Sequence, residues 1–303
     1  MNFKYIVNSN KYSNIKELLK VEFKLSERMI IKLKKEKRIF LNDSNVYISA
    51  PLTFNDVVLV NMDFIETADN IQPTQMNLDI IYEDEYLLIL NKPAGLPIHP
   101  SANHFFDSLS NGVKYYFDNK KLSIKIRPVN RLDKDTSGIV IFAKHPYIQE
   151  CLIKQMKDKK FCKNYLALVS GVFIPENGTI KAPITRKDNS IIERTIDLSS
   201  TLDKEQAITH YKTIEIFKNA SLVEFTLETG RTHQIRVHSK FMNCPLIGDT
   251  LYGSPSTLIS HQALHAYKIS FYHPITNEFL EFTTQMPEDF KQAYFQLKIH
   301  NIS

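Results

Sequence analysis

Two carboxylates stand among cations in a short polar stretch, Arg131-Leu132-Asp133-Lys134-Asp135, just before the turn residues Thr136-Ser137-Gly138. The next five residues, 139–143, are all apolar and predict a strand that is buried on both faces. Loops mounted on buried strands often carry catalytic groups. A carboxylate beside cations stays ionised and can act as a nucleophile or a base. From these residues alone Asp133 and Asp135 are equal candidates, and an ordinary solvated turn explains the stretch equally well.

Several other kinds of site find little support in the 303 residues. The three cysteines are far apart and odd in number, so they predict neither a disulfide framework nor a metal site. His233 and His238, five residues apart, would point to different faces of a helix or strand and are a poor chelating pair. The chain has no glycine-rich phosphate loop and no Gly-x-Ser-x-Gly elbow. These residues therefore predict no metal site.

The charge balance permits an acidic polymer as a partner. The formal net charge is +5 and the sequence pI is about 8.8. The chain lacks both an apolar run long enough to cross a bilayer and an apolar segment like that of a signal peptide near Met1. These features predict a cytoplasmic protein with no membrane contact.

Residues 1–66 are predicted to form a small α+β unit of their own. Asn14 and Ser26 are suited to capping two helices. Short strands are expected at 39–41, 46–48 and 57–60, with the first two joined through a turn at 42–45. Residues 67–77 are polar and without periodicity, which predicts a linker, and 78–303 would form the second domain.

A basic stretch runs through the second predicted helix. Residues 20–38 hold eight basic and three acidic side chains, a surplus of five positive charges. Such a concentration indicates a surface that contacts phosphates, although a solvated helix face has a similar composition. The candidates for RNA contact here are Lys32, Lys34, Lys35 and Arg38.

The second domain reads as strands with frequent hairpins and fewer helices. Residues 161–171 alternate so that Tyr165, Ala167 and Val169 share one face of a strand. Gly230 ends another strand, and Thr232 is expected to cap a helix running to about Met242. This pattern predicts an α+β fold with a mixed, largely antiparallel sheet.

At this point six ordered segments resemble one family, the RluA-type pseudouridine synthases. The resemblance covers residues 78–290, and the first 66 residues resemble, more weakly, an S4-type RNA-binding domain. The matching segments are Asn91-Lys92-Pro93-x-Gly95 with His99-Pro100, Arg131-Leu132-Asp133-x-x-Thr136-Ser137-Gly138, Lys163-x-Tyr165-x-Ala167-x-Val169, Gly230 to His238, Pro245-Leu246-x-Gly248-Asp249-x-x-Tyr252-Gly253, and Leu264-His265-Ala266.

The resemblance implies a reaction without cofactor or metal, in which a uridine in RNA is detached from its sugar, turned and rejoined through carbon. By position in the motifs, Asp133 matches the catalytic aspartate, whereas Asp135 falls at a variable position. Tyr165 matches the residue that stacks on the target base, and without the motif it would be taken for a core aromatic. Arg236 matches the arginine paired with the aspartate, and Arg131 matches a residue that enters the duplex as the base flips.

Three further residues receive expected roles from the Gly230 motif. Ile235 is expected to contact the substrate, and Arg231 and His233 are expected to shape the loop or contact RNA. One departure is Asn130, where many members have His before Arg-Leu-Asp. An amide can still form hydrogen bonds and hold a turn.

The layout resembles the subfamily that modifies large-subunit ribosomal RNA, and a transfer RNA target is the alternative. A second alternative is an RNA-binding or RNA-folding protein whose catalysis is dispensable, and a third is a hydrolase that uses the two aspartates and releases uracil. RNA is the expected partner, and we expect a monomer that needs no protein partner.

Overall fold

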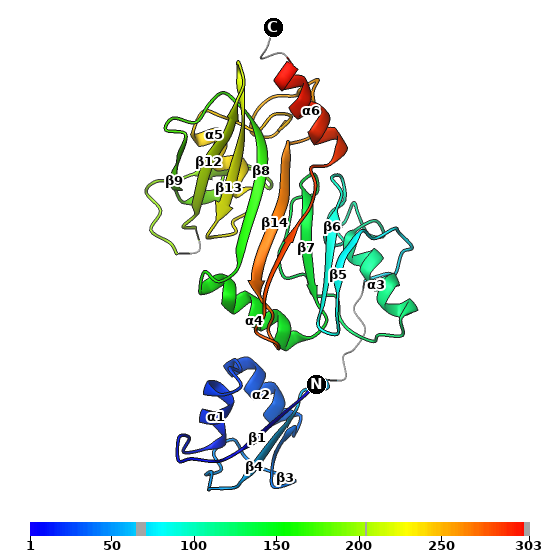
Figure 1. The fold of residues 1–303 in the computed structure, drawn as a ribbon, viewed down its shortest axis with the longest axis vertical. Helices are drawn as coiled ribbons and strands as arrows, with labels where there is room; N and C mark the ends of the chain where they lie inside the picture. Colours follow the sequence, from blue (N-terminus) through cyan, green and yellow to red (C-terminus); the bar gives the residue numbers. More distant parts are fainter. Residues whose placement is uncertain (65–70, 204, 300–303) are drawn as a thin grey trace. The chain divides into compact units, whose positions relative to one another are not determined.

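The structure is a computed structural model that describes residues 1–64, 71–203 and 205–299. The chain divides into two compact units, Met1–Ala68 and Asp69–Ser303 (Figure 1). Residues 67–70 of the predicted linker, residues 65 and 66 of the first predicted domain, and residues 204 and 300–303 of the second lie outside the described residues.

The described part of the first unit, residues 1–64, combines two helices with a small antiparallel sheet. The helices are α1 (Ile15–Val21) and α2 (Glu27–Lys35). The strands, in their order across the sheet, are β1 (Asn2–Ile6), β4 (Val57–Asn61), β2 (Ile39–Leu41) and β3 (Ser44–Asn45). The apolar sides of both helices and of β4 are fully buried, so one small core holds the unit together.

Local signals explain where its helices begin. Asn14 accepts a hydrogen bond from the Glu17 backbone N–H at 3.0 Å, and Ser26 accepts one from Met29 at 3.1 Å, as the sequence predicts. The prediction of a strand at 46–48 is wrong, because the strand found here, β3, begins two residues earlier, at Ser44. Asn42 and Asp43 both have positive φ, so they turn the chain in two residues.

Among its described residues, the second unit has a nine-stranded sheet, and the centre of this sheet is a strand from late in the sequence. The order is β5 (Ile80–Glu83), β6 (Leu87–Lys92), β7 (Ser137–Ala143), β14 (Leu264–Tyr272), β8 (Cys162–Ser170), β13 (Ala220–Leu227), β12 (Ile208–Ile216) and β9 (Asn177–Lys181), with β15 (Phe279–Thr283) paired to β14. All these pairs are antiparallel except β7 with β14. The predicted α+β fold with a mixed, largely antiparallel sheet is confirmed.

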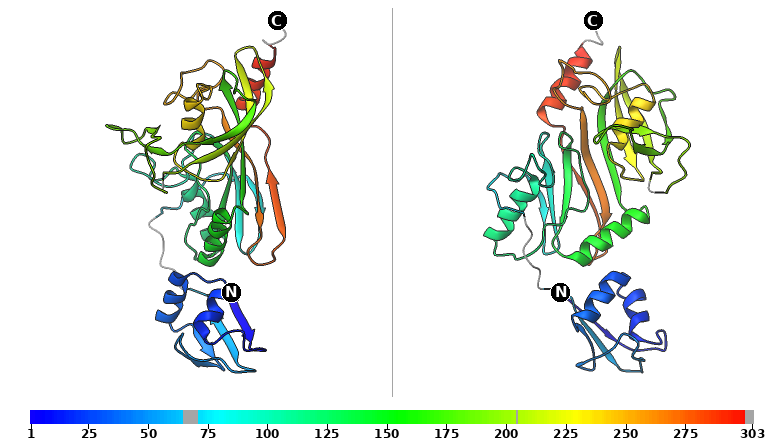
Figure 2. Two further views of the ribbon diagram at one scale, coloured as in Figure 1. Left: turned by 90° about the vertical axis from the view of Figure 1, so that its left-hand side faces the viewer. Right: turned by 180° about the vertical axis from the view of Figure 1, so that it is seen from behind.

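Helices and a small hairpin complete this unit. They are α3 (Leu109–Asn119), α4 (Pro146–Lys157), α5 (Gln234–Phe241), α6 (Glu288–Ile299) and the pair β10 (Ile184–Arg186) with β11 (Arg194–Ile196). Figure 2 shows the central strands from two further sides, with α4 at one end of them. Thr232 is not the cap of α5: the helix begins after His233, which has φ of 57° and makes no side-chain capping bond.

Part of the predicted linker packs against α3. The buried Asn111 side chain donates to the Gln72 carbonyl at 2.7 Å, and the Thr74 N–H donates to the Asn111 carbonyl at 3.1 Å. Met76 lies so close to Gly112 that an added Cβ there would be 2.3 Å from Met76 Cγ. Residues 71–77 therefore belong to the second unit rather than forming a free connection.

Gly138 is where the loop around Asp133 joins the sheet. Its φ is +114°, and it pairs with Ala266 across the single parallel contact, between β7 and β14. A Cβ at this position would lie 2.3 Å from the Ala266 carbonyl oxygen. Only glycine satisfies both the backbone angle and the close approach.

We expect Gly138→Ala to lower the free energy of unfolding by more than the roughly 1–3 kcal/mol that backbone strain alone costs. Gly95→Ala is the matched control, because Gly95 has φ of +81° but nothing within 4 Å of an added Cβ. Urea unfolding of both variants measures the difference. Equal losses would mean that the contact with Ala266 relaxes without cost.

Two buried histidines predict how stability depends on pH. Burial lowers the pKa of His238 and of His265 to about 4, from the ordinary value of 6.5. Between these values the unfolded chain binds protons that the folded chain does not, so stability rises with pH. Unfolding free energies should therefore fall as pH drops from about 6.5 towards 4, and His238→Gln should reduce that slope. An unchanged slope in this variant would contradict the assignment.

Candidate active site

A cleft of about 830 Å³ opens between the segment 129–136 and the segment 227–236. Its remaining walls come from the end of α4, from Lys163 and Tyr165 of β8, from Ile208 of β12 and from Leu264 of β14. The volume falls in the range of about 300–1,000 Å³ that is usual for sites binding small ligands. The cleft thus brings together residues from four of the segments that the sequence singled out.

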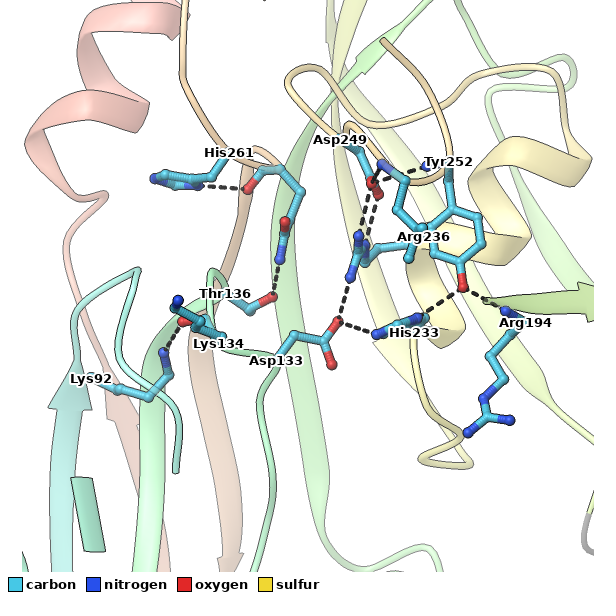
Figure 3. A network of polar contacts seen from close by, with 12 residues as sticks. Lys92, Asp133, Lys134, Thr136, Arg194, His233, Arg236, Asp249, Tyr252 and His261 are labelled. Atoms are coloured by element: carbon cyan, nitrogen blue, oxygen red, sulfur yellow. Dashed lines mark hydrogen bonds and ion pairs between the residues drawn. The ribbon is translucent and has the colours of Figure 1, made fainter. Parts of the chain in front are cut away.

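Asp133 and Arg236 meet in this cleft, although 103 residues separate them. Arg236 Nη1 donates to Asp133 Oδ2 at 3.1 Å, and Asp133 keeps 27% of its side chain exposed. The other edge of the guanidinium donates to both oxygens of Asp249, from Nε at 2.7 Å and from Nη2 at 2.8 Å (Figure 3). Asp249 is fully buried, so this fork fixes the orientation of Arg236.

The negative charges around Arg236 keep its guanidinium protonated. Burial lowers its pKa, but the hydrogen bonds and charge of Asp249 and the charge of Asp133 more than offset this and raise the pKa above its ordinary value. The guanidinium is therefore a permanent cation that faces the Asp133 carboxylate from inside the protein. A cation held in this way stabilises negative charge at Asp133 Oδ2 and leaves Oδ1 free of this contact.

His233 lies on the second side of Asp133. Its Nε2 is 3.8 Å from Asp133 Oδ2, and its Nδ1 is 2.8 Å from the Tyr252 hydroxyl. That hydroxyl also accepts the Arg194 backbone N–H at 2.8 Å, so Tyr252 ties His233 to β11. Burial lowers the pKa of His233, while the charge of Asp133 opposes the shift. His233 Nε2 thus faces Asp133 from the side opposite to its contact with Tyr252.

Tyr165 projects from β8 into the cleft. Its side chain is 6% exposed, and its hydroxyl makes no hydrogen bond with a described residue. Burial, followed by the charge of Asp133, raises the pKa of its phenol, so the hydroxyl stays protonated. Ile235, 3% exposed, lines the same cleft and packs in the same apolar cluster as Tyr165. An aromatic ring and an apolar side chain therefore border the space beside Asp133.

Two buried polar side chains hold the loop that carries Asp133. Asn130 donates to the Ile139 carbonyl and accepts the Ile141 N–H, both at 2.9 Å, so its amide clamps the loop to β7. Lys92 is fully buried and donates to the carbonyls of Pro93, Leu96 and Lys134, each at 2.8 Å. Asn130, where many members of the resembled family have His, thus keeps a structural role.

The electrostatics of Lys92 involve both aspartates of the loop. Burial lowers the pKa of its ammonium to about 7, and the charges of Asp135 and Asp133 oppose this shift. Asp135 is half-buried and does not line the cleft. It therefore acts on the buried cation behind the loop, whereas Asp133 faces the cleft.

Several cations line the cleft. Arg131 is exposed and makes no hydrogen bond or ion pair with any described residue. Arg231 is held in place, because its guanidinium donates to the carbonyls of Gln206 at 2.9 Å and Asp203 at 3.0 Å. Lys163 lies on the wall, where burial lowers the pKa of its amine. The exposed Arg131 is therefore the cation of this lining best suited to contact a phosphate backbone.

The predicted RNA contacts of the first unit lie at the end of α2. Lys34 and Lys35 are exposed. Lys32 lies over the Phe64 ring, 3.7 Å from Nζ to its centroid. Arg38 donates to Glu36 at 2.8 Å and to Asn61 at 3.3 Å. Two of the four cations are thus exposed and two are partly engaged within the unit.

Sequence reasoning gave no role to three residues that the structure brings into this network, namely Asp249, Tyr252 and Lys92. All three stood in the quoted motifs, but buried polar partners cannot be told from ordinary loop residues without the fold. Across the ranges 1–64, 71–203 and 205–299, no three His, Cys, Asp or Glu side chains form a group that could hold a metal. No helix in the described part of the chain is long and apolar enough to span a membrane.

Comparison with known proteins agrees with the geometry. The family model described as RNA pseudouridylate synthase matches residues 86–240. An uncharacterized RNA pseudouridine synthase of Bacillus subtilis, YlyB, is 38% identical over 268 residues, covering 87% of each chain. The ribosomal large subunit pseudouridine synthase D of Zymomonas mobilis is 36% identical, covering 81% of this chain and 80% of that protein.

A solved structure supports the fold independently. Human RNA pseudouridylate synthase domain containing 4 superimposes with a TM-score of 0.60 at 22% identity, covering 73% of this chain and 93% of the other. The segment matched by the family model, residues 86–240, contains Asp133, Tyr165 and Arg236. On the family model and the close relatives together, the chain belongs to the RluA-type RNA pseudouridine synthases.

Proposed function

We propose that this enzyme isomerises specific uridines of large-subunit ribosomal RNA, with Asp133 as the catalytic residue. The observation that carries the proposal is the Asp133 carboxylate, held 3.1 Å from a buried arginine and open to the cleft beside Tyr165. The name of the Zymomonas relative supports the choice of RNA. A transfer RNA target is the alternative outcome of the experiment below.

The residues of the cleft supply what the isomerisation needs. The bond between uracil N1 and ribose C1′ breaks, C5 bonds to C1′, and the proton on C5 leaves while N1 gains one. Asp133, as nucleophile or base, is fixed by Arg236. The ring of Tyr165 offers a surface for the detached base, which must stay in place while it turns. Arg131 stands at the opening, where a base flipped from a duplex would leave a gap.

The target is identified by mapping pseudouridine in total RNA from a strain that lacks the gene. We expect one or a few uridines of large-subunit ribosomal RNA to lose the modification and to regain it when the wild-type gene is restored. Loss confined to transfer RNA would replace the proposed target and leave the reaction intact. An unchanged map in both RNAs would overturn the proposed function.

The first unit is proposed to bind RNA in the manner of an S4 domain. Its support is the exposed basic end of α2, including Lys34 and Lys35. Replacing both with Glu should weaken RNA binding and lower the slope of log K against log salt by about 0.7–0.9 for each phosphate that the protein no longer neutralises.

The matched control is Lys218→Glu with Lys291→Glu, which reverses two exposed lysines outside the cleft. Titrations with total RNA at several salt concentrations measure both effects. Equal weakening in the two double variants would mean that only net charge matters, and the basic end of α2 would have no special role.

A further inference from the structure

Two neighbouring aromatic side chains stand exposed in the second unit, outside the cleft. Phe105 is 52% exposed and Phe106 is 60% exposed. Their ring centroids are 4.8 Å apart, with an interplanar angle of 79°. Leaving two large apolar rings in water is unfavourable, and the packing of the unit gives no reason for it. A pair of adjacent exposed rings is therefore a candidate contact surface.

The loop that carries this pair is held firmly. Ser101 and His104 exchange two backbone hydrogen bonds of 3.1 and 3.0 Å, and His104 Nδ1 lies 2.8 Å from Asp107 Oδ2. The buried side chain of Asn111, which also takes part in the capping box of α3, donates to the Phe105 carbonyl at 3.1 Å. These bonds hold the backbone at Phe105 and tie down the residues on either side of the pair, so little order has to be gained on binding.

The same loop touches the segment of the proposed catalytic residue. Lys134 Nζ lies 3.2 Å from His104 Nε2, and Lys134 directly follows Asp133. Phe106 is two residues from His104, which limits the separation of their Cα atoms to about 7 Å. Neither Lys134 nor His104 lines the cleft, and in Figure 3 Lys134 lies on the side of Asp133 away from Arg236. The aromatic pair therefore lies outside the cleft lining, on a loop that contacts the residue next to Asp133.

We propose that Phe105 and Phe106 stack on an unpaired base next to the target uridine in the RNA strand. This inference rests on the proposed function and adds a second point of contact to it. Extrusion of the target base leaves its neighbours partly unstacked, and an exposed ring restores stacking to one of them. The exposed cations Lys134 and Arg131 favour the intervening phosphates, which argues for nucleic acid over an apolar protein partner.

The first test is the double variant Phe105→Ala/Phe106→Ala, assayed on total RNA from the strain that lacks the gene. We expect kcat/KM at the mapped uridine to fall roughly 5- to 150-fold, which corresponds to the usual strength of base stacking on one aromatic ring. The loss should appear in KM with kcat nearly unchanged, because the rings do not touch the reacting atoms. Phe105→Tyr/Phe106→Tyr, which keeps both rings, should retain wild-type values.

The matched control is Phe279→Ala on β15, which removes a ring that is 57% exposed and lies outside the cleft. Melting temperatures of all variants exclude unfolding as the cause of a loss. Wild-type kcat/KM in the alanine double variant would overturn the inference, and would leave a protein partner as the better use of this surface. A loss of kcat alone would also overturn it.

A second experiment identifies the contacted base. A stem-loop RNA carrying the mapped uridine is made with an abasic nucleotide at each neighbouring position in turn. At one position the abasic change should lower kcat/KM for the wild type but have little effect on the alanine double variant, because the two changes remove the same contact. Additive losses at every position would contradict stacking.

The two proposals fail in different ways. Should Asp133→Asn keep its activity while the phenylalanine variants lose affinity, the proposed catalytic residue is wrong and the stacking surface stands. Should Asp133→Asn be inactive while the phenylalanine variants behave as wild type, only the stacking surface is wrong.

Discussion

Asp133→Asn should abolish pseudouridine formation while the protein still folds and binds RNA. The amide keeps the size of the side chain but cannot act as a nucleophile or base towards the sugar. The rate should fall by at least about 10⁴-fold, as when a central catalytic group is removed from other enzymes. Arg236 stays paired with both oxygens of Asp249, so stability should change little. Single-turnover assays on total RNA from the strain that lacks the gene give the rate.

Asp135→Asn is the control, because it makes the same chemical change two residues away and outside the cleft lining. It should keep activity within a few-fold of the wild type. Appreciable turnover by Asp133→Asn would remove Asp133 from the reaction. Inactivity of both variants with intact folding would assign the chemistry to the pair. Release of free uracil by the wild type would instead reveal a hydrolase.

Asp249→Asn should also lower the rate, but less than Asp133→Asn, because Asp249 positions Arg236 and takes no part in the chemistry itself. It removes one charge from a pair that is almost entirely buried and leaves the Arg236 guanidinium with a single anionic partner. Breaking a buried ion pair costs about 3–5 kcal/mol of stability. A guanidinium that shifts by even 1 Å would no longer hold Asp133, and the rate should fall about 100-fold.

A suitable comparison is Glu193→Gln, which breaks the more exposed ion pair of Glu193 with Lys187. Such surface pairs contribute at most about 1 kcal/mol, and no change in rate is expected. Urea unfolding and single-turnover rates together separate the two effects of Asp249→Asn. A stable variant with unchanged kcat would show that Arg236 needs no second anion. A loss confined to KM would assign Asp249 to RNA binding instead.

Much of the architecture could be predicted because local signals were strong. The caps at Asn14 and Ser26 and the apolar runs of β6 and β7 follow from residue type and periodicity, and the structure has them in place. Local signals failed where tight geometry decided. Because Asn42 and Asp43 turn the chain in only two residues, the next strand lies earlier than predicted. The residue that precedes α5 is His233, which has a positive φ, and not the expected capping residue Thr232.

The site could be predicted only in part, for a physical reason. Asp133 and Arg236 become partners through pairings of strands that lie far apart in the sequence, and periodicity carries no information about such contacts. Only the resemblance to the family assigned both residues to one site, through their positions in the motifs. They gave no role to Asp249 or Lys92, because the importance of these residues comes from burial, which only the packed fold reveals.

The position of β14 has a consequence for the way the enzyme is made on the ribosome. This strand lies between β7 and β8 in the sheet but follows both in the chain by about a hundred residues. At about 5–20 residues per second, Asp133 waits several seconds or more for residues 264–272 to be synthesised. Until then the two halves of the sheet can each fold by hairpin pairing but have no strand between them. A nascent chain that ends before Leu264 therefore already contains the residues proposed to take part in the chemistry. It lacks β14, the strand that joins the two halves of the sheet.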